Sequence, residues 1–391
     1  MDTQEIRKLA ETYRDYAVEA RRWFHSHAEL SNQEFQTTEY IIRQLEEMGI
    51  PYVTPGNTGA IGIISGIQPG PVLGIRADID ALPIQELSDV PYRSMYDGVM
   101  HACGHDAHAA SLLGTAQILN QLKDRFHGTV KLIFQPAEEY FPSGALTMMG
   151  KGDLDDCDAI IGAHTGGLIP SGKVNVEPGP RMASSASVNI HVKGQGGHGG
   201  RPHEAIDAIV VAAAIIMNLQ TVVSRELNIN NSAVLSIGTL QAGTAKNIIA
   251  EDAYMTGTLR YFDPELIKTL EASVQRVASN TAAAYRATAE VEIVPGLPAV
   301  INDYALAELA EKTAIDLFGK DNIIPLSKVC GTDDFAYYAD KAPILYARIG
   351  VMNEEKVQAV PLHNPRFDID EDYLVQAMEF FSAFALRYNN R

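Results

Sequence analysis

The stretch HACGHDAHAA at residues 101–110 concentrates groups that can bind a metal ion. It holds three histidines, an aspartate and one of the three cysteines of the chain: His101, Cys103, His105, Asp106 and His108. A thiolate and an imidazole two residues apart can face one ion if the chain turns between them, which a glycine permits. Histidines can also gather by chance where a helix begins, here near Asp106. The thiol in the same cluster favours the metal site.

Two adjacent carboxylates, Glu138 and Glu139, follow an apolar run and Pro136 in the segment KLIFQPAEE. Adjacent side chains project in different directions, so one carboxylate can bind a metal while the other accepts a proton from a water nucleophile. A Glu-Glu pair can equally be a solvated surface pair. Its position after a predicted buried strand keeps the catalytic interpretation open beside the surface one.

Two single histidines supply further donors. His164 ends the apolar run AIIGAH, and His363 lies in the loop VPLHNPRFDIDE ahead of the last predicted helix. Each alone is typical of a surface or capping histidine. Together with Cys103, His105 and Glu139 they give a set of N, S and O donors that suits one or two divalent ions such as Zn²⁺ or Mn²⁺.

A glycine-rich segment, GQGGHGGRPH, places His198 and His203 between a predicted strand and a predicted helix. The glycines allow the backbone to approach a ligand closely, and His198 can act as an electrophile toward a substrate oxygen. His203 can simply begin the helix. Arg260, in GTLRYF, can bind a substrate carboxylate through its guanidinium or lie on the exposed face of a strand.

The elements that must position these residues follow an α/β pattern. Short β-branched runs alternate with helical periodicity over roughly the first 180 residues, which is typical of a mostly parallel sheet flanked by helices. Ligands of such sheets bind beyond the carboxyl ends of the strands. Polar residues follow the apolar runs at these ends: Asp78, Asp80, Glu138, Glu139 and His164.

Residues 183–296 follow a different order, β-α-β-β-α-β, which is that of a split ferredoxin-like domain. Helices and strands of the first type resume after them. The sequence therefore predicts a two-domain α/β protein, with a catalytic domain formed by residues 1–182 and 297–391. The inserted domain, residues 183–296, is predicted to be ferredoxin-like α+β.

Composition and charge restrict the partners and the location. A formal net charge of -18 argues against nucleic acid and anionic membranes as partners. The longest apolar run, AIVVAAAIIM at 208–217, is about half the length that a bilayer requires and predicts a buried helix. The N-terminal segment lacks the features of a signal peptide, and the few cysteines indicate the cytoplasm. Cys157 and Cys330 are expected to be packing residues.

In this order, the motifs HACGHDAH, QPAEE, a histidine after the next apolar run, GHGGRPH and LHNP resemble the metal-dependent amidohydrolase family. This family includes aminoacylase-type and hippurate-hydrolase-type enzymes and the plant hydrolases of indoleacetyl-amino acids. The resemblance implies a catalytic domain with a dinuclear metal site and an inserted lid domain that forms a homodimer. By motif position, it implies these metal ligands: Cys103, His105, Glu139, His164 and His363.

The same resemblance implies that Glu138 is the general base and that His198 reaches the oxyanion, in its own or a partner subunit's site. Asn247 and Arg260 would hold the substrate carboxylate. Asp106 and His108 are expected to support the ligands, because a carboxylate can orient a ligating imidazole. The implied activity is hydrolysis of the amide bond of N-acyl amino acids with Zn²⁺ or Mn²⁺, or with Ni²⁺ or Co²⁺.

Three alternatives remain at this point. A dipeptidase or carboxypeptidase breaks the same bond by the same mechanism. A thiol amidase would use Cys103 as nucleophile, and a metal-storing or ligand-binding protein would need only the donors. Two departures from the family pattern concern the surroundings of the site: HTGGLIPSG after His164 is more open and polar, and Asp333 stands where glutamate is common.

Overall fold

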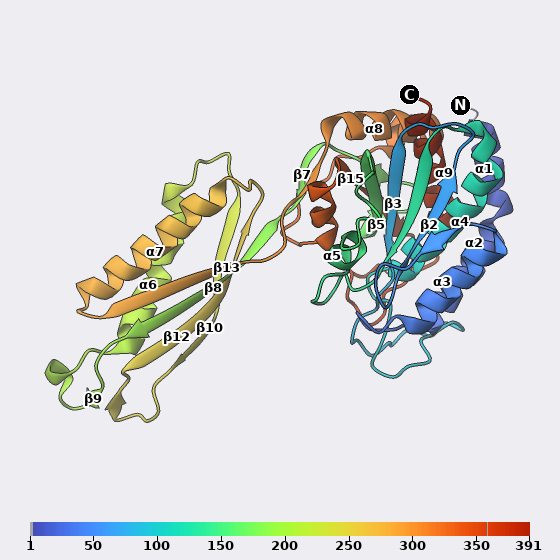
Figure 1. Ribbon diagram of the computed structural model, residues 1–391. Helices are drawn as coiled ribbons and strands as arrows, with labels where there is room; N and C mark the ends of the chain where they lie inside the picture. The colour runs from blue at the N-terminus through green and yellow to red at the C-terminus, as the bar shows by residue number, and fades with distance from the viewer. Residues whose placement is uncertain (1–2, 358) are drawn as a thin grey trace. The chain divides into compact units, whose positions relative to one another are not determined.

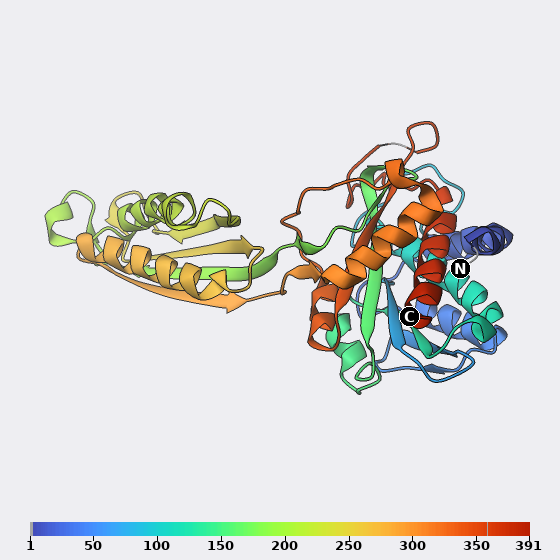
Figure 2. The ribbon, with the colours of Figure 1, turned by 90° about the horizontal axis from the view of Figure 1, so that it is seen from above.

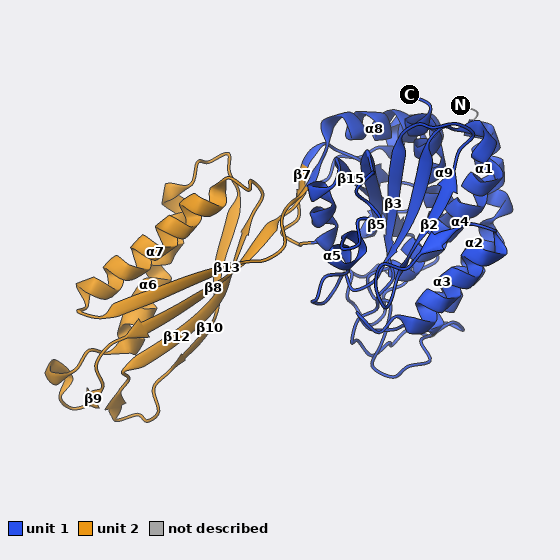
Figure 3. Ribbon diagram, in the orientation of Figure 1, with its two compact units in different colours: residues 1–179, 301–327, 333–391 blue, residues 180–300, 328–332 orange. Residues whose placement is uncertain are grey.

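The computed structural model describes residues 3–357 and 359–391, and the chain divides into two compact units (Figure 3). Unit 1 comprises the chain up to Gly179, Ile301–Ser327 and Asp333–Arg391. Unit 2 comprises Pro180–Val300 and Lys328–Thr332. The strands β7 (Gly179–Met182) and β14 (Val300–Asn302) lie where the chain passes from one unit to the other.

Unit 1 is built on a seven-stranded sheet (Figure 1). In spatial order its strands are β1 (Tyr52–Val53), β2 (Ala60–Ser65), β4 (Thr129–Gln135), β3 (Val72–Asp78), β5 (Ala159–Pro170), β15 (Ile344–Met352) and β6 (Val174–Asn175). The four central strands are parallel, as predicted, whereas β1, β2 and β6 pair antiparallel with their neighbours. The sheet is therefore mixed, because a short connection such as that between β1 and β2 can only return the chain antiparallel.

Helices surround this sheet. They are α1 (Thr3–Thr12), α2 (Arg14–Ser26), α3 (Phe35–Glu47), α4 (His105–Gln121), α5 (Gly144–Met149), α8 (Tyr304–Phe318) and α9 (Asp372–Asn389). Helix α4 is almost wholly buried and packs against α2 and α9. A Cβ atom at Gly114 would lie 2.1 Å from the sulfur of Met378 in α9, so a larger residue there would require the Met378 side chain to move. Close packing fixes the position of the helix start at His105.

Strand β5 is longer than the sequence indicated. The apolar run was expected to end at His164, but the strand continues to Pro170. His164 therefore lies within the strand, opposite Arg348 of β15, and not at its end. Backbone pairing with β15 holds residues 165–170 in the sheet, although the two glycines among them are typical of a loop.

Unit 2 has a four-stranded antiparallel sheet with two helices on one face (Figures 1 and 2). The spatial order of the strands is β10 (Ala233–Ala242), β12 (Asp252–Tyr261), β8 (Ser184–Lys193) and β13 (Thr288–Pro295). The helices are α6 (Ala208–Thr221) and α7 (Leu266–Ala284). A separate two-stranded antiparallel sheet is formed by β9 (Gly197–His198) and β11 (Ile248–Ile249). The element order is the β-α-β-β-α-β order read from the sequence.

Helix α6 is buried on one face only, whereas the sequence predicted a buried helix. A π-helical turn, Val222–Glu226, extends it, so the apolar helix reaches a length and composition that could span a membrane. One face packs against the unit 2 sheet through residues such as Val211 and Ile215. Ile209, Val210 and Met217 on the other face are exposed. The interpretation as a buried helix is therefore wrong for that face.

The three cysteines are free. Cys103 and Cys157 are buried, as expected of a ligand and a packing residue, whereas Cys330 is exposed. The expectation that Cys330 packs inside the protein is therefore wrong, because residues 328–332 form an exposed connection and not part of an element.

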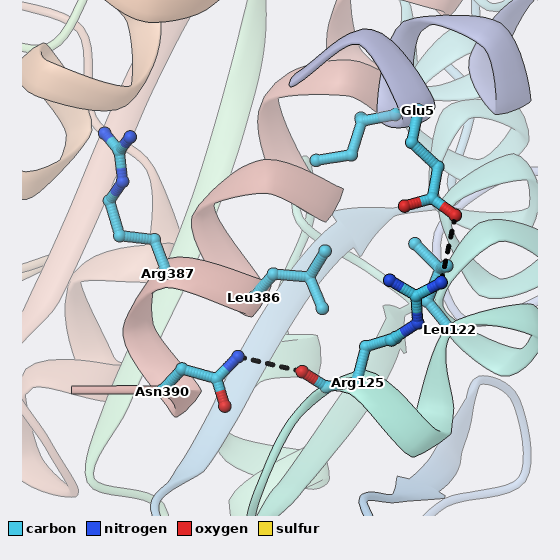
Figure 4. Close-up of a pocket in the computed structure, with 7 residues that line it drawn as sticks. Glu5, Leu122, Arg125, Leu386, Arg387 and Asn390 are labelled. Carbon is cyan, nitrogen blue, oxygen red and sulfur yellow. Dashed lines mark hydrogen bonds and ion pairs between the residues drawn. The ribbon is translucent and has the colours of Figure 1, made fainter. Parts of the chain in front are cut away.

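A cavity of about 370 Å³ opens at the carboxyl end of α4 (Figure 4). Arg125 at its wall is paired with Glu5 at 3.4 Å, and Arg387 is paired with Asp316. The seventeen residues of α4 place this cavity roughly 25 Å from His105. It therefore takes no part in the site described next.

Candidate metal centre

The five predicted metal ligands converge in unit 1. Cys103 and His105 come from the start of α4, Glu139 from the turn after β4, His164 from β5 and His363 from the loop before α9. Donor atoms lie within 4.8 Å of one another in three overlapping groups: Cys103, His105 and His164; Cys103, Glu139 and His363; and His105, Glu138 and Glu139. Segments far apart in the sequence thus supply one cluster.

Gly104 makes the turn between the first two ligands possible. Its φ of 89° lies in the left-handed region, and a Cβ atom there would meet Thr165 Oγ1 at 2.6 Å. The turn ends the extended segment at Cys103 and begins α4 at His105, so both side chains face the same point. Cys103 Sγ lies 3.4 Å from His164 Nε2.

Backbone hydrogen bonds orient two of the imidazoles. His105 Nδ1 donates to the carbonyl of Asp80 at 2.9 Å, and His164 Nδ1 donates to the carbonyl of Thr165 at 2.8 Å. Each ring therefore turns its Nε2 toward the cluster. His105 Nε2 is buried and finds no hydrogen-bond partner in the described part of the chain. Buried nitrogen atoms without a partner are rare in proteins, and a metal ion bound here would satisfy this one.

Glu139 and His363 complete the donor set. Glu139 Oε1 is buried and lies 3.2 Å from His363 Nε2. The backbone N–H of Glu139 donates to Asp80 Oδ2 at 3.0 Å. His363 has a φ of 65°, and its N–H donates to the carbonyl of Ala102 at 2.7 Å. This bond ties the His363 loop directly to the segment that carries Cys103.

The two supporting residues proposed from the motif have different surroundings. His108 uses both nitrogens, since Nδ1 donates to Asp78 Oδ1 at 2.5 Å and Nε2 accepts the N–H of Thr165 at 2.9 Å. It supports the site and has no nitrogen left for a metal. Asp106 instead binds Arg21 and His25. The expectation that Asp106 orients a ligating imidazole is wrong, because Asp80 holds that position.

Glu138 lies beside the donors and beside two further carboxylates. A carboxylate oxygen of Glu138 is within 4.8 Å of oxygens of Asp333 and Asp334. Burial and then the negative charge of Asp333 raise the pKa of Glu138 well above its usual range. A carboxylate with a raised pKa next to a group of metal donors is suited to accept and return a proton.

Arg76 is an important residue that the sequence reasoning missed. It is buried under the site, where its guanidinium binds Asp78 Oδ2 at 2.6 Å and Asp334 Oδ1 at 3.1 Å and lies 3.4 Å from Asp333 Oδ1. The Arg76 guanidinium thus faces three carboxylates. One belongs to Asp78, which binds His108, and the other two belong to Asp333 and Asp334, which lie near Glu138. Asp333, the departure from the family pattern, also accepts a hydrogen bond from Tyr346 at 2.5 Å. The sequence did offer one sign of the role of Arg76, because a charged residue inside the otherwise apolar run VLGIRADID is expected to have a buried partner of opposite charge.

The remaining predicted residues lie in unit 2. His198 and Asn247 are neighbours, since the N–H of Gly199 donates to the carbonyl of Asn247 at 2.8 Å and His198 pairs with Ile248. Arg260 lies near the other end of β12, paired with Ser185. The eight steps from Asp252 to Arg260 along the strand span roughly 26 Å. One copy of unit 2 therefore does not bring Arg260 together with His198 and Asn247.

Comparison with known proteins identifies the family of this chain. A model of peptidase family M20/M25/M40 matches residues 74–387. The chain belongs to this family. N-acetylcysteine deacetylase of Bacillus subtilis (strain 168) is 42% identical over 371 residues, which cover 94% of this chain and 96% of the relative. Thermostable carboxypeptidase 2 of Saccharolobus solfataricus is 36% identical over 382 residues, covering 96% of each chain.

A solved structure of an M20 family member has the same fold. The YXEP protein of Bacillus subtilis, described as a dinuclear metal binding peptidase, superposes with a TM-score of 0.87 at 38% identity. The match covers 97% of this chain and 99% of that one. The resemblance read from the motifs is thereby confirmed, and the protein is a metal-dependent amidohydrolase of the M20 family.

Proposed function

We propose that this protein hydrolyses the amide bond of N-acyl amino acids, with divalent metal held by Cys103, His105, Glu139, His164 and His363. The observation that carries the proposal is a cluster of N, S and O donors within 4.8 Å of one another, in which the buried His105 Nε2 has no hydrogen-bond partner among the described residues. The names of the relatives support the substrate class.

The metal and Glu138 have separate tasks in this mechanism. A divalent ion bound by these residues lowers the pKa of water and polarises a carbonyl group. Glu138 accepts the proton of the attacking water at its carboxylate and passes that proton to the leaving nitrogen, so the amine departs neutral. Burial and the negative charges of Asp333 and Asp334 strengthen the affinity of Glu138 for the proton.

The grouping of the donors supports two ions. Cys103 belongs both to the group with His105 and His164 and to the group with Glu139 and His363. Cys103 would hold an ion together with either group, so the donor set would accommodate one or two ions. Mixed thiolate, imidazole and carboxylate ligands suit Zn²⁺, Mn²⁺, Ni²⁺ or Co²⁺, and we propose Zn²⁺ or Mn²⁺ as the native metal.

The Cys103 thiol amidase is disfavoured. Burial raises the pKa of the Cys103 thiol to about 12 when no ion is bound to it. A nucleophilic cysteine needs a lowered pKa to be a thiolate at neutral pH. The storage alternative is also disfavoured, because it gives no task to Glu138, whose carboxylate is not needed as a ligand.

We further propose that His198 and Asn247 act in the site of a partner subunit. The roughly 26 Å along β12 exceeds the length of a small N-acyl amino acid, so His198 and Arg260 of one chain cannot contact the same substrate molecule. In a homodimer formed through unit 2, His198 of one subunit and Arg260 of the other would be able to contact the same substrate molecule. The exposed apolar face of α6, with Ile209, Val210 and Met217, is typical of an interface and supports the proposal.

A carboxypeptidase or dipeptidase remains the second candidate, because a relative of similar identity is named a carboxypeptidase. A panel of acetyl, benzoyl, indoleacetyl and long-chain acyl amino acids, assayed beside dipeptides in the presence of metal, separates the two. Faster hydrolysis of the acyl amino acids supports the proposal, and faster hydrolysis of peptides supports the alternative.

We also propose a cytoplasmic location, with which the free cysteines are in keeping.

A further inference from the structure

Glu34, just before α3, is buried behind the turn that carries Glu138 and Glu139. Its Oε1 accepts the backbone N–H of Ala137 at 2.8 Å and that of Asn32 at 2.9 Å. Ala137 has a φ of 46° and Asn32 a φ of 65°. Alanine rarely adopts this left-handed region, whereas asparagine does so more readily, so a buried acceptor that binds both N–H groups stabilises one unfavourable backbone conformation, at Ala137, and the turn at Asn32 beside it.

Other contacts fix the turn on either side of Ala137. The carbonyl of Ala137 accepts the N–H of Gly144 at 3.0 Å, and Asp80 holds the N–H of Glu139. A Cβ atom at Gly144 would lie 1.6 Å from the carbonyl oxygen of Pro136, so the chain packs closely there. The N–H of Ala137 faces Glu34. The carboxylate therefore fixes the orientation of the Pro136–Ala137 peptide, and the Gly144 N–H fixes the Ala137–Glu138 peptide that follows it.

We propose that Glu34 is a positioning residue for the general base, holding the Ala137 peptide so that Glu138 points toward the metal donors. This inference rests on the proposed function of Glu138. Glu34 lies two residues from Asn32 and more than a hundred from Ala137 in the sequence, so it links the start of α3 to the catalytic turn.

The role requires an oxygen that accepts two N–H groups, not a negative charge. Burial, with a further contribution from Asp80, raises the pKa of Glu34 to about 7, so a neutral side chain is tolerated at this place. Glutamine offers the same oxygen, and its amide can face the hydroxyl of Thr58, which can accept a hydrogen bond. Leucine keeps the volume but offers no acceptor.

The test compares Glu34→Leu and Glu34→Gln in the metal-loaded enzyme. We expect Glu34→Leu to lower kcat roughly 100-fold, since a displacement of about 1 Å in a catalytic group has this effect. KM and metal content stay within about twofold of the wild-type values. Glu34→Gln restores kcat to within about threefold. An unchanged kcat in Glu34→Leu, or a loss of metal that explains the lower activity, would overturn the proposal.

Glu29→Leu is the matched control. The Glu29 carboxylate accepts the N–H groups of Gln36 and Thr37 at the start of the same helix, so this variant also removes two backbone hydrogen bonds but leaves the turn intact. It keeps the wild-type kcat. An equal fall in kcat in both variants indicates a general loss of α3 and contradicts a specific role of Glu34.

Hydrogen exchange separates this inference from the proposed function. Exchange of the peptide that covers residues 135–140 becomes faster in Glu34→Leu and not in Glu34→Gln, whatever reaction the enzyme catalyses. Unchanged protection in Glu34→Leu overturns the positioning role even if the amidase activity is established. If Glu34→Leu does not fold, Glu34→Asp replaces it: a lowered kcat with wild-type KM supports the role, and a wild-type kcat contradicts it.

Discussion

The carbonyl oxygen of Asp80 accepts the Nδ1–H of His105 at 2.9 Å, while the Asp80 carboxylate accepts the N–H of Glu139 at 3.0 Å. One residue thus orients a ligand from α4 and a ligand from the turn after β4. Its carboxylate also accepts a hydrogen bond from Ser31 at 2.7 Å. Asp80 therefore positions two of the candidate metal ligands, His105 and Glu139, relative to each other.

Replacing Asp80 with alanine tests this relationship. The His105 bond to the backbone carbonyl survives, but the carboxylate near His105 Nδ1 and the bond to Glu139 are lost. We expect the affinity for metal to fall about 10- to 100-fold, as for other groups that orient metal ligands. Titration of metal-free protein with Zn²⁺ measures the change. Asp89→Ala, at an exposed position of the same chain segment, should bind as the wild type does.

Glu138→Gln should abolish turnover and leave the metal in place. The amide cannot accept the proton of the attacking water, and general bases contribute about 10²- to 10⁴-fold to rates. Assay of kcat alongside elemental analysis of the purified variant provides both readouts. An inactive variant that has also lost its metal would reassign Glu138 as a ligand.

Mixing two inactive variants tests the shared site. Glu138→Gln lacks the base and His198→Ala lacks the group that we propose for the oxyanion, a contact worth roughly 10²-fold in kcat or more. In a mixed dimer, one of the two sites regains both groups when His198 comes from the partner. Equal mixing and subunit exchange should restore about a quarter of wild-type activity. If the mixture is no more active than its components, His198 acts in its own subunit or not at all.

Arg76→Met should destabilise the protein strongly. The change removes the one cation that the buried carboxylates of Asp78, Asp333 and Asp334 share. Loss of one partner from a buried ion pair costs about 3 to 5 kcal/mol in the free energy of unfolding. Urea denaturation measures this value. Arg276→Met, which breaks an exposed pair with Glu226, should cost less than about 1 kcal/mol.

The raised pKa of the buried His25 predicts that the stability of the protein depends on pH. Burial alone would lower its pKa, but hydrogen bonds to Asp106 and Glu86 outweigh burial and the nearby charge of Arg21, and the pKa rises from 6.5 to about 9. Because the folded protein binds this proton more tightly, the stabilisation is complete below pH 6.5 and is lost as the pH rises to 9. The difference in unfolding free energy between the wild type and His25→Gln should shrink by about 3 kcal/mol over this range. A constant difference would show that His25 does not titrate there.

The candidate ligands could be picked out from the sequence because each lies in a motif of the family that the chain resembles, and the structure brings their donor atoms together. Cys103 and His105 flank a glycine, and Glu139 follows an apolar run and a proline. The role of Asp106 was misjudged for the same reason, since nearness in sequence suggested a contact with His105 that Asp80 makes instead. Local patterns identify residues, and tertiary packing decides which of them touch.

Contacts over long sequence separations could not be predicted. Arg76 and Asp334 are 258 positions apart, and nothing local to either residue reveals the pair. Glu34 likewise meets Ala137 across 103 positions. The extension of β5 past His164 also depends on a partner, because β15 supplies the hydrogen bonds that hold its glycines in a strand. Such features follow from the assembled sheet and not from propensity.

Removal and return of metal tests the central claim most directly. Hydrolysis of an N-acetyl amino acid is measured before treatment with EDTA, after it, and after addition of Zn²⁺ or Mn²⁺, with the bound metal counted at each stage. We predict that activity disappears with the metal and returns in proportion to one or two ions per subunit. Full activity in the metal-free protein, lost only on treatment with iodoacetamide, would contradict the account and favour the thiol of Cys103.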